Sequence, residues 1–290
     1  MTLLFTLAKP LLHRMDPENA HNLTINLLKR LGPQRRIDDD PRLAVSLFGL
    51  NFPNPIGLAA GFDKNGNAIN MLSSAGFGAI EIGSVSQRPS AGTPDRPRLH
   101  RLPEDEGLVV FYGVPNDGAE RVAARIAGTP PLVQRPPLGI SLVETNTGLP
   151  APVDAVIEQL QQCARHFIGL ADYFAINLHC PNSPGGKGHF QNPQHLAQLL
   201  QRLNELPAMP PTLLKIAPDH DDAGIDVRAD EVRQYRAIND AQRLHAAHAQ
   251  FRIDDTALVA PHAAGAARVV EGARHLADVR LHLVGRLHLR

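Results

Sequence analysis

From residue 45 onward, short apolar runs alternate with helix-like stretches, and this alternation limits the possible folds more than any other feature. A short apolar run bounded by turn residues indicates a buried strand, and apolar residues at every third or fourth position indicate a helix. The predicted strands are 56–60, 79–82, 138–142, 173–178 and 213–217. The predicted helices are 67–75, 118–126, 152–169 and 193–206. This order predicts an α/β domain over residues 45–290 with a parallel sheet, either doubly wound or closed into a barrel.

Residues 1–36 are predicted to form a separate helical unit. An apolar helix pattern near the start is followed by Asp16-Pro17-Glu18, which favours a helix start because Asp caps and Pro suits the first turn. The unit carries six basic residues and two acidic ones. A basic amphipathic helix pair is typical of a peripheral membrane-surface element. A helical hairpin packed on the main domain is the alternative.

Composition excludes several classes of protein. Basic and acidic residues balance at 29 each, which argues against a nucleic-acid partner. The two cysteines, Cys163 and Cys180, give neither a zinc spacing nor a disulfide framework, so we expect no metal and a reducing compartment. No apolar run reaches the roughly 18 residues that a membrane span needs.

Polar residues follow the predicted strands, where both parallel architectures bind ligands. Ala60 and Gly61 precede Lys64 in a glycine-rich segment that would let a flat ligand approach the backbone. Ser84 ends the second strand, and Asn177 and Cys180 end the fourth. Each of these has a structural alternative. The segment before Lys64 could be a simple glycine-rich turn, Ser84 could cap a turn, and Cys180 could be an inert core thiol. Lys215 lies within an apolar run, so it is expected to need an anionic or electron-rich partner.

Five motifs together resemble the dihydroorotate dehydrogenase family and occur in the family's order. They span residues 54–64, 76–83, 97–102, 177–182 and 215–219. The N-terminal unit, with Met15–Glu18 and Ala20-His21, is similar to the extension of the membrane-associated, quinone-using class. The resemblance covers about residues 5–219.

This resemblance implies a (β/α)₈ barrel of TIM type with an N-terminal helical hairpin and FMN at its C-terminal face. It implies flavin contacts by Ala60, Gly61, Lys64, Ser84, Asn177 and Lys215. Lys64, Asn177 and Asn182 would contact the substrate. Cys180 takes the position of the catalytic base, where serine is usual in the quinone-using class and cysteine in the soluble one.

The implied activity is oxidation of dihydroorotate to orotate, with quinone as acceptor, in de novo synthesis of the pyrimidine UMP. The base would remove the proton from C5, and hydride would pass from C6 to flavin N5. The implied location is peripheral, on the cytoplasmic side of the cell membrane.

Several positions depart from the family's motifs. Val110 replaces the leading amide of the run that grips orotate, Ser141 replaces a flavin-contacting amide, and Glu144 stands where lysine is usual. A site built to hydrogen-bond a polar ring loses affinity when a donor becomes apolar. Val110 and Pro115 therefore leave open a flavin oxidoreductase with a changed substrate.

The segment after residue 219 has a different composition. It contains ten arginines and no lysine, and only four of the 23 glycines. The family's second-half motifs, including its phosphate-binding turn, are not found there. We therefore expect that this segment does not match the family or complete a normal barrel, and that flavin binding is weak or absent. An inactive, C-terminally altered barrel is the alternative reading of function.

Overall fold

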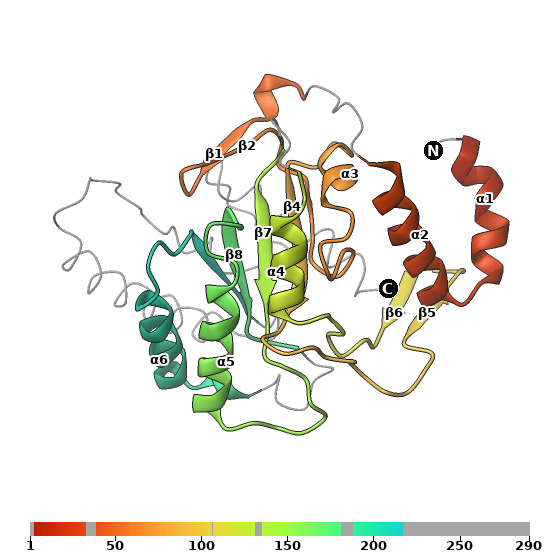
Figure 1. Cartoon of the computed structure of the whole chain (residues 1–290). Helices are drawn as coiled ribbons and strands as arrows, with labels where there is room; N and C mark the ends of the chain where they lie inside the picture. The colour runs from red at the N-terminus through yellow and green to blue at the C-terminus, as the bar shows by residue number, and fades with distance from the viewer. Residues whose placement is uncertain (1–2, 33–38, 106, 131–134, 181–187, 217–290) are drawn as a thin grey trace, which may run out of the picture.

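The computed structural model describes residues 3–32, 39–105, 107–130, 135–180 and 188–216 (Figure 1). Five parallel strands form the main sheet, in the order β3-β4-β7-β8-β9. Their bounds are β3 Gly57–Leu58, β4 Ala79–Val85, β7 Leu138–Leu142, β8 Tyr173–Asn177 and β9 Thr212–Lys215. All five predicted strands are confirmed, with ends that differ by a few residues.

The strand order distinguishes the two candidate architectures. Each strand of the main sheet lies beside the previous one along the chain, so these five strands show no reversal. A doubly wound sheet reverses its order at a switch point, whereas a barrel adds strands in one direction. The described half of the sheet therefore has the arrangement of a TIM-type barrel.

Helices follow the strands as the apolar spacing predicted. They are α3 Ile69–Ser73, α4 Ala119–Ala127, α5 Val153–Arg165 and α6 Pro193–Asn204. In Figure 1, α5 and α6 lie side by side against the sheet. The wholly buried side chains of Ile140, Phe174 and Leu199 belong to one core between strands and helices. Burial of each such side chain stabilises the fold by about 1.5–3 kcal/mol.

Two antiparallel hairpins were not predicted. One pairs β1 Val45–Leu47 with β2 Leu50–Phe52, and the other pairs β5 Leu99–Leu102 with β6 Gly107–Val110. Two single 3₁₀ turns, η1 Pro41–Leu43 and η2 His189–Gln191, also lie outside the prediction. These strands are three or four residues long, too short to give a clear period-two pattern.

The N-terminal residues form a helical hairpin, α1 Leu3–Arg14 and α2 Pro17–Leu31, as predicted. The Asp16 side chain caps α2 by accepting from the backbone N–H of Asn19 at 3.0 Å, and Pro17 opens the helix. No helix in the described ranges is long and apolar enough to cross a bilayer.

Polar contacts hold this hairpin against the barrel beside β5 (Figure 1). Glu18 forms a bidentate, buried ion pair with Arg98. Arg101 donates to the backbone carbonyls of Leu12 at 3.0 Å and Met15 at 2.9 Å, at the turn between the helices. The hairpin is thus packed on the main domain. The segment after residue 219, with its predicted failure to complete the barrel, lies outside the described residues.

Candidate functional site

The site begins at the carboxyl ends of β3 and β4. The N–H of Gly61 donates to the carbonyl of Gly83 at 2.7 Å, which joins the glycine-rich segment to the end of β4. Gly61 has a φ of 110°, and a side chain built there would point into open space. A flat ligand can therefore approach this backbone closely.

Asp63, which the sequence did not single out, shapes the turn that carries Lys64. Its carboxylate is 1% exposed and accepts from the backbone N–H groups of Asn67 at 2.9 Å and Ala68 at 2.7 Å. An aspartate that satisfies several backbone donors fixes a tight turn. The following residue, Lys64, is thereby directed to the same end of the sheet as Ser84.

A row of polar side chains crosses three neighbouring strands at this end of the sheet. Asn177 Nδ2 donates to Ser84 Oγ at 3.1 Å, and Ser84 Oγ lies 2.8 Å from Ser141 Oγ. Because serine is short, Ser141 on β7 leaves room for Asn177 on β8 to reach Ser84 on β4. Asn177 Oδ1 is buried and has no hydrogen-bond partner in the described part of the chain. The row therefore presents one unsatisfied acceptor.

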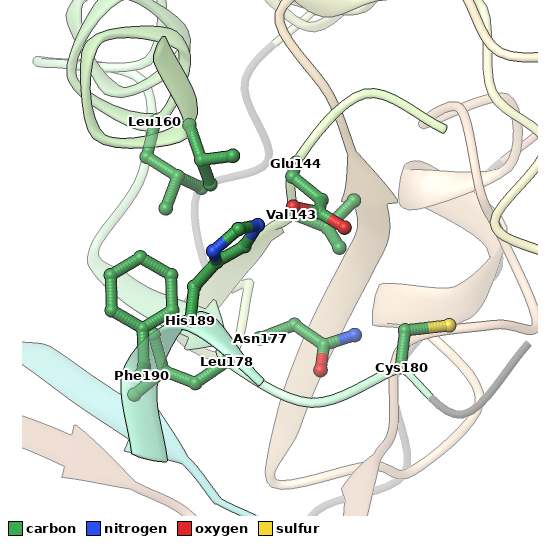
Figure 2. Close-up of a pocket in the computed structure, with 9 residues that line it drawn as sticks. Val143, Glu144, Leu160, Asn177, Leu178, Cys180, His189 and Phe190 are labelled. Carbon is green, nitrogen blue, oxygen red and sulfur yellow. The ribbon is translucent and has the colours of Figure 1, made fainter. Parts of the chain in front are cut away.

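Cys180 lies three residues beyond Asn177 and is 8% exposed. Figure 2 shows its thiol and the Asn177 amide extending to the same side of the chain. The other cysteine, Cys163, is wholly buried in α5, and burial raises the pKa of its thiol. A buried thiol of raised pKa is inert, so Cys180 is the better candidate for chemistry.

A small pocket lies beside Asn177 and Cys180 (Figure 2). His189 enters it from η2, and its Nε2 is buried without a hydrogen-bond partner among the residues that the structure describes. The Glu144 side chain lies on the other wall. No sequence pattern pointed to His189, because a lone histidine after a loop has no distinctive spacing. The pocket is lined by Val143, Glu144, Val156, Leu160, Asn177, Leu178, Cys180, His189 and Phe190.

Lys64 lies in a cluster that joins three distant segments of the chain. Its Nζ is 3.3 Å from His21 Nε2 on α2 and 4.4 Å from the centre of the Tyr112 ring. Arg98 also stacks on Tyr112, at 5.3 Å. Burial lowers the pKa of Lys64 to about 8, and the carboxylates of Glu18 and Asp63 oppose that shift. The lysine is therefore a partly desolvated cation beside an electron-rich ring.

Three further predicted site residues are Lys215, Asn182 and Ala60. Lys215 pairs in register with Asn177 and ends β9, but its side chain is exposed. Lys215 thus lies in the predicted apolar strand, as its last residue, and its role at a ligand stays a prediction. Asn182 lies outside the described residues, and Ala60 precedes Gly61 at the end of β3.

A family model described as dihydroorotate dehydrogenase matches residues 42–253, most of the chain and beyond the last motif at 219. The chain belongs to the dihydroorotate dehydrogenase family. Relatives named dihydroorotate dehydrogenase (quinone) are 42% identical in a Bradyrhizobium species over 76% of this chain, and 42% identical in Rhodopseudomonas palustris over 72% of it. The chain spans 60% and 57% of those relatives' lengths.

Solved structures of dihydroorotate dehydrogenase from Eimeria tenella have the same fold. The ligand-free form is 27% identical with a TM-score of 0.68, covering 76% of this chain and 67% of the other. The complex with ferulenol is 28% identical with a TM-score of 0.65, covering 76% and 64%. The fold is therefore α/β of TIM-barrel type with N-terminal helices, as the five motifs implied.

Proposed function

We propose that this protein oxidises dihydroorotate to orotate, with FMN as cofactor and a quinone as electron acceptor, in de novo pyrimidine synthesis. The observation that carries the proposal is the polar row Ser84, Ser141 and Asn177 beside the open face of Gly61. The row lies at the carboxyl ends of parallel strands, where barrel enzymes hold their ligands. The relatives' name supplies the reaction that such a site would perform.

The residues present fit a flavin ring. The buried acceptor Asn177 Oδ1 suits a ring N–H, and the space beside Gly61 suits a planar group. Lys64 would compensate the negative charge of a reduced ring. The proposed flavin contacts are Ala60, Gly61, Lys64, Ser84, Asn177 and Lys215.

The chain's own residues would position the substrate and move one proton. Lys64, Asn177 and Asn182 would bind dihydroorotate, and the Cys180 thiolate would take the proton from C5. FMN held by these residues would supply the redox chemistry, as acceptor of the hydride from C6 and donor of two electrons to quinone. Val110 contributes no polar group where the family has an amide, so we expect a weaker grip on the orotate ring.

The N-terminal hairpin is proposed to bind the cytoplasmic surface of the cell membrane as a peripheral element. Leu11, Leu23, Leu27 and Leu31 are each at least half exposed on α1 and α2. Basic side chains, among them Lys9, Arg14, Lys29 and Arg30, are exposed on the same two helices. Exposed leucines flanked by cations are the composition that binds anionic lipid surfaces. A quinone acceptor would be drawn from that membrane.

The test is orotate production by the full chain supplied with FMN, dihydroorotate and a soluble quinone. We expect orotate formation that requires both FMN and the quinone. A chain that binds FMN yet leaves dihydroorotate unchanged would overturn the proposed activity. Screening other cyclic amides and imides with that same preparation then tests for a changed substrate.

A further inference from the structure

The contact between α2 and Lys64 indicates a role for a residue outside the proposed catalytic set. His21 Nε2 lies 3.3 Å from Lys64 Nζ, although the two residues are 43 positions apart. Among the described residues, His21 provides the one hydrogen-bond partner recorded for Lys64 Nζ. The other close group is the Tyr112 ring, which attracts a cation but accepts no conventional hydrogen bond.

His21 is held in a fixed orientation by its own surroundings. Its ring meets the Phe62 ring edge-on with centroids 5.4 Å apart, and it forms a hydrogen bond with the Phe62 backbone. Burial and the nearby Lys64 cation lower the pKa of His21 to about 4, so the ring is neutral at neutral pH. A neutral histidine carries its N–H on one ring nitrogen and accepts at the other, and with the N–H on Nδ1 the Nε2 beside Lys64 is the acceptor.

We infer that His21 is a positioning residue that accepts a hydrogen bond from the Lys64 ammonium and holds it, charged, toward the ligand side of the barrel. An acceptor for the ammonium favours its charged form and so opposes the effect of burial. Three charged groups act on Lys64. They are Glu18, which lies on α2 with His21, Asp63, which precedes Lys64 in its turn, and Arg98, which lies beside Tyr112. This inference rests on the proposed function for the role of Lys64 at a flavin, but the contact itself does not.

Two matched substitutions separate the acceptor from the rest of the ring. His21→Gln extends an amide to the position of Nε2 and retains the acceptor. His21→Asn extends an amide only to the position of Nδ1, so it retains a polar group there and loses the contact with Lys64. His100→Phe serves as a control, because His100 is exposed and hydrogen-bonds the Pro97 carbonyl, away from Lys64.

The measurement is the pH dependence of acetylation of Lys64 by trace acetic anhydride, read by peptide mass spectrometry on the full chain without added flavin. The exposed lysines Lys9 and Lys29 are internal references in every digest. Wild type should show a midpoint near the lowered pKa of about 8. His21→Asn should lower that midpoint by about one unit, which raises the reactivity of Lys64 at pH 7 about fivefold.

His21→Gln and His100→Phe should match wild type. Equal shifts in the Asn and Gln variants, or no shift in the Asn variant, would overturn the inference. If the Asn variant does not fold, His21→Phe retains the ring and removes both polar contacts, and it must show the same lowered midpoint. If the wild-type protein forms no orotate but shows this titration pattern, the proposed function is refuted and the role of His21 stands.

Discussion

Asn177 and Cys180 illustrate what a sequence specifies at the scale of single residues. Both were placed at the end of a strand by sequence pattern, and the structure extends them to the same side of the chain. The contact of Asn177 with Ser84 spans 93 positions, so no local pattern could predict it. The same holds for His21 and Lys64. Residue types at strand ends were predictable, whereas their partners depend on the packing of distant segments.

We predict that Cys180 is the base of the proposed reaction. Cys180→Ala should slow reduction of bound flavin by dihydroorotate by at least about 10², the lower range for general-base catalysis. Cys163→Ala is the matched control, since that thiol is wholly buried in α5 and should leave the rate within a few-fold. Stopped-flow absorbance of the flavin gives the rate. An unchanged rate in Cys180→Ala removes this residue from the mechanism.

The Glu18–Arg98 pair is predicted to stabilise the fold at neutral pH. Their side chains are 10% and 5% exposed, so Glu18→Gln leaves a buried guanidinium without its counter-charge. The substitution should lower the free energy of unfolding by about 3 kcal/mol, near the lower end for broken buried pairs. The loss is not larger because Arg98 still donates to the carbonyls of Ala91 and Thr93. Urea unfolding of both proteins measures it.

The same pair has a defined pH dependence. The hydrogen bond from Arg98 lowers the pKa of Glu18 below its ordinary 4.5. Its contribution is therefore fully present above about pH 4.5 and is lost as the pH falls through the lowered pKa. The stability difference between wild type and Glu18→Gln should shrink in that acid range. A difference that stays constant down to pH 3 contradicts this assignment.

At the scale of elements, helices and long strands were predicted well and hairpins were not. Helix α2 carried three independent signals, the Asp16 cap, Pro17 and a leucine repeat, and it begins at Pro17. The β5–β6 hairpin carried no such signals, yet it brings Arg98 and Arg101 to the N-terminal helices. The sequence also could not show whether that helical unit packs on the barrel or binds a membrane surface. One face of the unit can pack on the barrel while another face binds the membrane.

We predict that the exposed leucines of α2 bind membranes. Leu23→Ser combined with Leu27→Ser should reduce flotation with anionic vesicles at low salt at least about tenfold, because each exposed leucine contributes apolar area on insertion. The control pair is Leu43→Ser with Leu149→Ser, two exposed leucines outside the hairpin. Equal losses in both pairs, or no vesicle binding by wild type, would make the hairpin purely structural.

At the scale of the whole molecule, the described half of the barrel carries the proposed contacts for a flavin ring but includes no recognised cradle for its phosphate. The open face at Gly61 could be predicted from the glycine-rich motif alone. The phosphate site of this family is formed by second-half motifs, and these motifs are not found in the sequence after residue 219. A phosphate cradle of backbone N–H groups favours FMN over riboflavin by charge-assisted hydrogen bonds. We therefore predict weak flavin binding with little preference for the phosphate.

Calorimetric titration of the full chain with FMN and with riboflavin tests this prediction. Similar dissociation constants, within about threefold, would mean that the ring contacts at Gly61, Ser84 and Asn177 supply most of the affinity. Asn177→Leu should then weaken both ligands equally, because it removes a ring contact and leaves any phosphate contact untouched. One-to-one FMN binding that is a hundredfold tighter than riboflavin binding would show instead that residues after 216 form a phosphate site whose sequence differs from the family's motif.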